Sequence, residues 1–597
     1  MSAPDPGALV VGNCSGFYGD RLSAMREMLT GDPRPDVLTG DYLAELTMLI
    51  LGRDQLRDAG LGYARTFLRQ AEDCLGLLVE GGTRLVVNAG GLNPAGLAEK
   101  VREAARGLGL DVPVAHVEGD DVRSLGVSGH PWPEGALTAN AYLGAAPITA
   151  ALAGGAQVVV TGRCADASLV VGPAAWHHGW AYDDPAALDA LAGATVAGHV
   201  LECGTHATGG NFSGFLDLPR DATPLGFPLA EVAADGSCVV TKQAGTGGAV
   251  TVDTVTAQLV YEVQTERYLT PDVTVRLDTV ALEADGPDRV RVSGTVGEAP
   301  PETLKVSVSV LGGMRNHVDL VLTGLDLDAK EAWVRAQLEP RLSAASVTWT
   351  RSAAPDPDAD TQQGASRTLR CTVRDADKGP VDRAFTAAVV DLALGSYPGF
   401  APVAPPAPAT PYGVHRAAYV ARGEVEAVVV HDDGAREVVV DGGARPTGSR
   451  GSGPGGPRTS TSDEPGGRGA TSPGEEPRDP VSVTKAPLGT FVHARSGDKG
   501  GDANLGLWVR HDDHPAYDDR VAWLLDVATP AWVTALLPEA EGLAVEVHPL
   551  PNLGGVNVLL PGLLGDGVAA SARFDPQAKG LGEWARGRSV DLPEGLL

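Results

Sequence analysis

The sequence has few basic residues, few aromatics and few cysteines for its length of 597 residues. Its 47 Lys and Arg are outnumbered by 76 Asp and Glu, so the formal net charge is -29. An acidic surface repels nucleic acid and anionic lipid, whose recognition needs clustered Lys and Arg, and no basic stripe with interleaved aromatics occurs. The charge therefore excludes nucleic acid and membrane as partners, but an anionic small molecule can still bind at backbone N–H groups or single arginines.

The six cysteines lie far apart and form no C-x-x-C pair, which excludes a dense disulfide framework. The N-terminus lacks the basic and apolar segments of a signal peptide. No apolar run approaches the ~20 residues that a membrane span needs. We therefore expect a cytoplasmic protein. Single cores stop growing near ~250–300 residues, so the chain should hold several domains.

Residues 1–224 are predicted to form an α/β unit. Three glycine-rich loops, at 12–20, 88–94 and 161–168, each follow an apolar strand pattern, and helical patterns separate them. This repetition is typical of a parallel sheet with helices on its faces. Ligands bind such sheets at the carboxyl ends of the strands, so we expect the three loops to converge there.

Three further parts follow. Residues 225–440 alternate apolar and polar positions in several strand patterns, which predicts a β-rich α+β region packed on the first unit. Residues 441–487 contain hardly any large apolar side chains and are predicted to be a disordered linker. Residues 488–597 are predicted to form a small α+β domain.

The stretch HVLECGTHATGGNFSGF, at 199–215, permits three kinds of site. His199, Cys203 and His206 could ligate zinc, but a structural zinc site normally has four ligands in two pairs, and Glu202 is the only close fourth candidate. Cys203 and His206 could instead be a thiolate and its base, although a buried inert cysteine is the more common outcome.

The third interpretation, which we favour, is a glycine loop that contacts a ligand. Glycine lets backbone N–H groups approach a ligand where a Cβ would clash, so Gly209, Gly210 and Asn211 are candidate binding residues. His206 would then be an acid or base.

The other loops supply further candidates. In TGRCADAS, Arg163 could hold a carboxylate or phosphate and Asp166 could act as acid or base; the alternative is an Arg–Asp pair within the loop, with Asp166 capping the next helix. GNCSGFYGDR offers Ser15 and Asp20, and NAGGLNP offers Asn88, but no loop matches the P-loop or dinucleotide patterns.

A further polar segment, HARSGDKGGDANLG at 493–506, lies between strand patterns. Its candidate binding residues, which could face the large domain, are Arg495, Asp498, Lys499, Asp502 and Asn504. The alternative is a solvated hairpin loop. Neither G-x-S-x-G nor H-E-x-x-H occurs, so no serine elbow or zincin motif is present.

The chain resembles the acyclic terpene utilisation AtuA family. The resemblance rests on long segments in order, among them SGFYGDR, LTGDYLAELTM, NAGGLNP, TGRCADASL, HVLECGTHATGGNFSGF, PLGFPLAEV, KQAGTGGAVT and YLTPDV. RSGDKGGDANLGLWVR, at 495–510, resembles the small AtuA-like domain often joined to the large one. The family accompanies acyl-CoA carboxylases, hydratases and dehydrogenases in terpenoid and branched-acid catabolism, which implies a pathway but no particular reaction.

Two main hypotheses follow. The first is an enzyme acting on an acyl-CoA thioester as a hydratase, lyase or hydrolase, with Asp166, His206 or Asp20 as acid or base and Arg163 and Arg495 holding anionic groups. The second is a non-catalytic accessory protein for an acyl-CoA carboxylase pathway, in which the linker and small domain dock a partner. A metal-dependent hydrolase is a third. A requirement for a divalent metal, self-association and association with pathway enzymes are left open.

Overall fold

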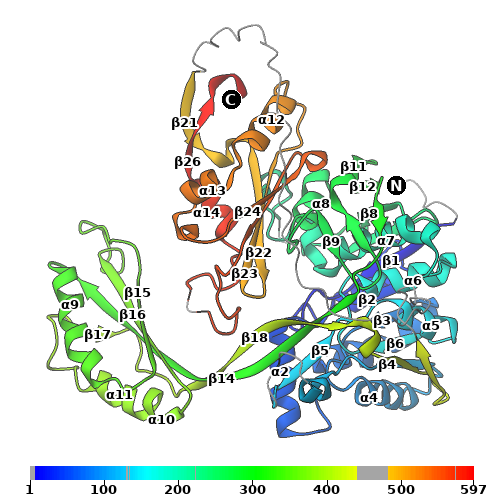
Figure 1. The fold of residues 1–597 in the computed structure, drawn as a ribbon, viewed down its shortest axis with the longest axis horizontal. Helices are drawn as coiled ribbons and strands as arrows, with labels where there is room; N and C mark the ends of the chain where they lie inside the picture. The colour runs from blue at the N-terminus through cyan, green and yellow to red at the C-terminus, as the bar shows by residue number, and fades with distance from the viewer. Residues whose placement is uncertain (1–6, 129–131, 133–134, 222, 440–481, 572) are drawn as a thin grey trace, which may run out of the picture.

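The computed structural model describes residues 7–128, 132, 135–221, 223–439, 482–571 and 573–597. A mixed sheet in the order β11-β12-β8-β7-β1-β2-β3-β6-β4-β19-β20 forms its centre (Figure 1). The five middle strands are parallel: β1 (Leu9–Asn13), β2 (Val37–Gly40), β3 (Arg84–Val87), β6 (Val158–Thr161) and β4 (Val114–Glu118). Antiparallel strands extend both edges: β7 (Pro228–Val232), β8 (Cys238–Lys242), β12 (Arg289–Ser293), β11 (Ala281–Ala284), β19 (Ala427–Val430) and β20 (Arg436–Val439).

Helices cover both faces of this sheet. The middle strands are buried except at Arg84 and Glu118, which lie at the ends of two of them, so they appear in the sequence largely as continuous apolar runs, such as VVVT of β6, and not as alternation. Successive residues of one strand point to opposite faces of the sheet and so enter different cores, as Leu85 and Val86 of β3 do. One core contains α1 (Ala24–Thr30), α3 (Arg65–Gly81) and α4 (Pro94–Gly107), and the other contains α5 (Ala146–Ala153), α6 (Ser168–His178), α7 (Leu188–Glu202) and α8 (Val252–Leu259). The predicted α/β class with a parallel sheet is confirmed.

Strands from both sides of the predicted division at residue 224 join in this one sheet. β7 pairs with β1, so the β-rich region continues the sheet of the first unit instead of packing on it. The same region also forms a separate three-stranded sheet, in the order β13-β10-β9, from β9 (Arg267–Leu269), β10 (Thr274–Arg276) and β13 (Val296–Glu298).

A long antiparallel arm leads away from the centre. The 21-residue strand β14 (Thr303–Thr323) pairs with β5 (Thr138–Ala141) and β18 (Thr410–Ala421) along its first part and with β16 (Ser366–Asp375) along its second. Figure 1 shows β14 and β18 running together from the central sheet to a peripheral unit. That unit has its own core and contains β15 (Ser346–Arg351), β17 (Ala401–Pro402), α9 (Leu327–Leu338), α10 (Lys378–Val381) and α11 (Arg383–Val390).

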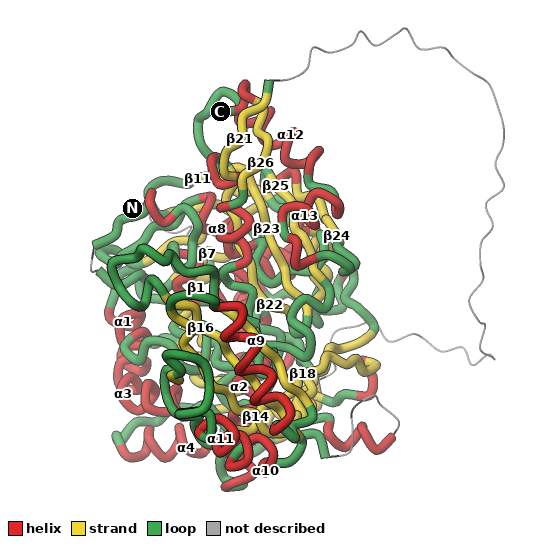
Figure 2. The backbone as a smooth tube through the Cα atoms, turned by 90° about the vertical axis from the view of Figure 1, so that its left-hand side faces the viewer, coloured by secondary structure: helices red, strands yellow, loops and turns green. Residues whose placement is uncertain are grey.

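The small C-terminal domain has a four-stranded antiparallel sheet, β22-β23-β25-β24, with helices packed on it. Its elements are β22 (Val492–Lys499), β23 (Asp502–Val509), α12 (Tyr517–Val527), α13 (Pro530–Leu536), β24 (Glu546–Leu550), β25 (Gly555–Leu560), α14 (Leu581–Gly587) and β26 (Ser589–Pro593). In both Figure 1 and Figure 2 this domain stands at the top, and the β22–β23 hairpin descends from it towards the rest of the molecule. The predicted small α+β domain is confirmed.

Residues 441–481, which are most of the predicted linker at 441–487, lie outside the described residues. Its last residues, Val483–Pro487, were expected to be disordered but form strand β21, which pairs with β26.

Candidate functional site

The loops after β1, β3 and β6 leave the same edge of the sheet, as the strand pattern predicted, and the loop after β2 joins them, because the four strands are parallel neighbours. Two buried side chains link these loops: Asn88 Nδ2 donates to Asp41 Oδ1 (2.5 Å), and Asn88 Oδ1 accepts from the Tyr42 N–H (2.7 Å). Burial, reinforced by the charge of Asp166, raises the pKa of Asp41 well above its usual range. Asn88 therefore positions a neighbouring carboxyl group and has both ends of its amide engaged.

Arg163 is enclosed at the end of β6. Its guanidinium donates to the Leu43 carbonyl (3.0 Å), to Asp166 Oδ1 (2.7 Å) and to the Tyr142 hydroxyl (2.9 Å), and it lies over the Tyr142 ring. The Arg–Asp pair within the loop is thus present. Asp166 does not cap α6, whose N-cap is Ala167 without a side-chain bond. Arg163 supplies a buried positive charge to the site but has few donors left for a ligand.

Glu202 ends α7 inside the protein. Its Oε1 lies 3.1 Å from His199 Nδ1, and its buried Oε2 has no hydrogen-bond partner among the described residues. Burial, together with the negative charges of Asp166 and Glu262, raises the pKa of Glu202 well above its usual range. Burial and the charge of Lys499 lower the pKa of His199 to about 4. His199 is therefore neutral at pH 7, and the raised pKa of Glu202 favours its protonated form, so both shifts oppose an ion pair between the two groups.

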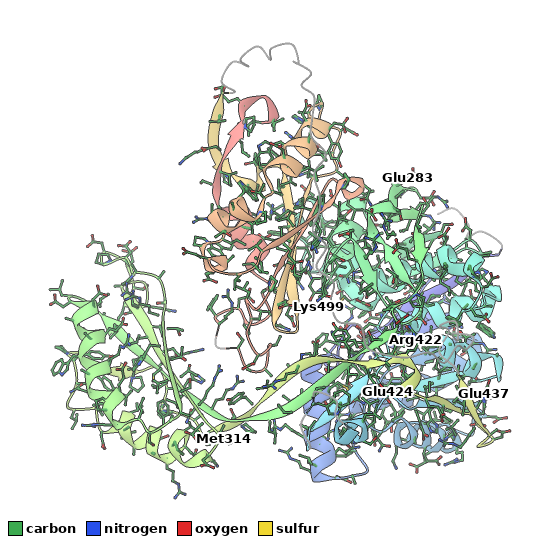
Figure 3. All side chains as sticks on the ribbon, in the orientation of Figure 1. Glu283, Met314, Arg422, Glu424, Glu437 and Lys499 are labelled. Carbon is green, nitrogen blue, oxygen red and sulfur yellow. The ribbon has the colours of Figure 1, made fainter. Side chains whose placement is uncertain are left out.

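The β22–β23 hairpin brings further charges to this place. Figure 3 shows Lys499 at the lower end of the hairpin, where the small domain meets the central part. Its ammonium group acts on Glu202 and on Glu45 of α2 (Glu45–Arg57). Although burial opposes the shift, positive charges led by Lys305 lower the pKa of Glu45 to about 2. The Lys499 ammonium itself makes no hydrogen bond or ion pair with any residue the structure describes.

A cleft with an empty volume of about 460 Å³ opens beside the hairpin. It lies between α2, the β14–β18 arm, the hairpin tip and the loop that follows β25; its lining includes Glu45, Ser309, His415, Asp498, Gly500 and Ala569. Burial, with the charges of Glu262 and Glu45, raises the pKa of Asp498 to about 8. The segment predicted as either a polar site or a solvated loop is thus a largely buried hairpin whose tip lines a cleft.

Other predicted residues form a second polar contact between the domains. Arg495 donates to the Asn211 carbonyl (3.0 Å), its Nη2 lies 2.9 Å from His206 Nδ1, and its guanidinium lies over the Tyr261 ring. Asn211 Nδ2 lies 2.8 Å from His206 Nε2. Burial and the charge of Arg495 lower the pKa of His206 well below its usual range. His206 is therefore a neutral imidazole at neutral pH, unsuited to act as a proton donor.

Several predicted residues are engaged within their own loops. The Gly209 and Gly210 amides donate to the carbonyls of His206 (3.2 Å) and Thr205 (2.9 Å), so these two do not offer a backbone cradle. Gly209 has φ 110°, and a Cβ there would meet Leu218, which is why the position requires glycine.

Three more candidates serve the same kind of role. Ser15 Oγ donates to the Phe17 carbonyl (3.0 Å), Asp20 accepts from the Gly16 and Arg21 amides, and Asp502 accepts from the Gly562 amide (2.8 Å). Asp20, proposed as an acid or base, therefore closes a loop.

Four of the charged groups were absent from the sequence-based candidates: Asp41, Glu45, Glu262 and Lys305. Asp41 and Glu45 stand in the segment DYLAE directly after β2, a strand that the sequence patterns did not reveal. Glu262 and Lys305 carry no local signal. Glu202 was considered only as a zinc ligand, and the described residues contain no group of three or more His, Cys, Asp or Glu that could hold a metal ion.

Comparison with protein-family models decides the relationship. Residues 9–431 match the acyclic terpene utilisation family protein AtuA. The chain belongs to this family. Residues 486–591 match the AtuA ferredoxin-like domain, which agrees with the small α+β domain. The family name ties its members to acyclic terpene utilisation. No curated protein and no solved structure matches the chain. Within the described part of the chain, no helix is both long and apolar enough to cross a membrane.

Proposed function

We propose that the protein is an enzyme of acyclic terpenoid or branched-chain acid degradation that adds or removes water on a CoA thioester by acid–base chemistry. Membership of the family supports the pathway. The reaction type is supported by one observation: the buried Glu202 carboxyl group, whose Oε2 has no partner and whose pKa is raised, lies within electrostatic range of the Lys499 ammonium group, which has no hydrogen-bond partner among the described residues.

Hydration and its reverse need two things from a protein. A proton must be moved at a carbon or a hydroxyl group, and negative charge on the thioester oxygen must be stabilised. The raised pKa of Glu202 favours its protonated form, which can donate a proton and take it back in the reverse direction. The Lys499 ammonium group, which bonds to none of the described residues, has donors for an oxygen that becomes negative. Neutral His199 holds the Glu202 carboxyl group by its Nδ1 contact.

A nucleophilic hydrolase is less well supported. Its nucleophile would be Cys203, but burial and the adjacent Glu202 raise the pKa of this thiol well above its usual range. The thiolate that attacks a thioester is therefore scarce at neutral pH.

The test is mass spectrometry of the full-length protein after incubation with CoA thioesters of acyclic terpenoid and branched-chain acids. We expect a mass change of one water on a substrate. Glu202→Gln should lower kcat by about 10²–10⁴-fold, the usual contribution of a general acid. Lys499→Met should also lower kcat. The matched control is Glu283→Gln, an exposed glutamate on edge strand β11 away from Lys499 (Figure 3).

The outcomes separate the hypotheses. Full turnover by the Glu202→Gln variant refutes the acid–base role. Tight retention of an unchanged thioester, without turnover, favours the non-catalytic accessory role instead.

A further inference from the structure

Two arginines lie side by side on the arm. Arg315 of β14 and Arg374 of β16 are directly opposite each other in the antiparallel register. Like charges in this arrangement destabilise a sheet. Neither guanidinium forms an ion pair with a carboxylate among the described residues. Arg370 lies four residues before Arg374 on β16, and its guanidinium donates to both carboxylate oxygens of Asp319 on β14 (2.7 and 2.8 Å). An arginine on these two strands can therefore be neutralised by a carboxylate on the opposite strand.

The pair adjoins the cleft of the candidate site. Arg315 Nη1 donates to the carbonyl of Ala569, which lines the cleft (2.9 Å). The Arg374 guanidinium lies 5.3 Å from the ring centre of Tyr412, whose neighbour Gly413 also lines the cleft. In Figure 3 the arm next to Met314 faces the loops of the small domain.

The surroundings favour an anion at this place. The two guanidinium groups repel each other, and burial together with the Arg374 charge lowers the pKa of Arg315. The chain as a whole carries a net charge of -29, so acidic side chains are abundant, and yet none of those that the structure describes pairs with these arginines. A planar guanidinium matches the oxygens of a phosphate group and can bind two of them at once.

We infer that Arg315 and Arg374 form the binding site for the phosphate groups of the CoA part of the substrate. This rests on the proposed function, because it assigns one end of the cleft to the same substrate. Lys499 stands between Asp498 and Gly500, two residues of the hairpin tip that line the cleft. Under this inference the phosphates would lie at the arginine pair and the thioester would lie towards Lys499.

The test is calorimetric titration of 3′-phospho-ADP, the nucleotide part of CoA, into the full-length protein. We expect binding by the wild type, and a loss of roughly tenfold or more in affinity for Arg315→Gln and Arg374→Gln, as for removal of a charge-assisted hydrogen bond. The Arg374 side chain makes no hydrogen bond to any of the described residues, so its variant reports on the ligand. Arg416→Gln is the matched control, because this exposed arginine of β18 pairs with Val308, seven residues along β14 from Arg315.

Kinetics separate this inference from the proposed reaction. The KM for the CoA thioester should rise in both variants, while kcat/KM for the matching pantetheine thioester, which lacks the nucleotide, stays unchanged. Lost nucleotide binding in the variants without turnover of any thioester supports the site and counts against the reaction. Turnover with unchanged KM in both variants, or no nucleotide binding by the wild type, overturns the site.

Discussion

Replacement of Asn504 should weaken the contact between the large and small domains next to the candidate site. It lies fully buried on β23, and its amide group makes three hydrogen bonds across the domain boundary or within the small domain. Nδ2 donates to the Val260 carbonyl (2.8 Å) and to Asn557 Oδ1 (2.7 Å), and Oδ1 accepts from the Glu262 N–H (2.9 Å). Glu262 has φ 58°, a conformation that costs a non-glycine residue of order 1–3 kcal/mol and needs support from its surroundings.

The size of the effect of Asn504→Ala follows from these contacts. The substitution leaves the Glu262 N–H without its acceptor and the Val260 carbonyl and Asn557 Oδ1 without their donor. Each buried polar group left unpaired costs about 1–3 kcal/mol. We therefore expect a loss of about 3 kcal/mol or more, which is roughly a 150-fold change in the folding equilibrium. The Glu262 backbone should relax as well, which should lower kcat.

Chemical denaturation, followed by the fluorescence of Trp508 and the other tryptophans, measures the stability change. The matched control is Asn552→Ala, because Asn552 also bonds across the boundary, to the Leu277 and Val280 carbonyls, but lies at an exposed position. Its loss should cost less than about 1 kcal/mol, since water replaces the bonds. Equal stabilities of the two variants, with full turnover in both, would refute the role of Asn504.

Three further predictions follow from the pKa shifts and ion pairs. Burial raises the pKa of Asp498 to about 8. The contribution of the Asp498 carboxyl group to stability is therefore complete below about pH 4 and is lost as the pH rises to 8. Between pH 5 and 8 the melting temperature of Asp498→Asn should fall less than that of the wild type. The Cys203 thiol, whose pKa is raised, should resist alkylation by iodoacetamide at pH 7.5 in the folded protein and react after unfolding, as measured by mass spectrometry. Cys203→Ser should retain turnover. Rapid alkylation of the folded protein would contradict both expectations. Glu231→Gln should destabilise the protein by about 3–5 kcal/mol in thermal denaturation, because the buried Arg289 guanidinium loses the carboxylate that accepts two of its hydrogen bonds. A change below about 1 kcal/mol would show that Asp285 neutralises Arg289 instead.

The convergence of the glycine loops could be predicted because it depends on local signals. Strands buried on both faces leave continuous apolar runs in the sequence, and a parallel order places their carboxyl ends at one edge. Asn88, Arg163 and Asp166 were found in this way, since each follows such a strand. The prediction of their roles was less complete: Arg163 and Asn88 hold other groups of the protein, and only the folded structure shows how their donors are engaged.

The remaining members of the site depend on contacts between distant segments. Asp41 and Glu45 follow β2, whose four residues, VLTG, are too few to produce a recognisable pattern. The conformation of Glu262 is fixed by an amide more than two hundred residues later in the chain. The raised pKa of Glu202 comes from burial and from the charges of Asp166 and Glu262, which no local pattern encodes.

The division of the site between two domains has a chemical consequence. In the proposed reaction, the proton donor Glu202 belongs to the large domain, and the cation Lys499 belongs to the hairpin of the small one. The positive charge of Lys499 lowers the pKa of Glu202, partly offsetting the effect of burial and of Asp166. Withdrawal of the hairpin would remove this cation and leave no partner for a negative oxygen. Under the proposed function, docking of the small domain would therefore supply the charge that faces the substrate.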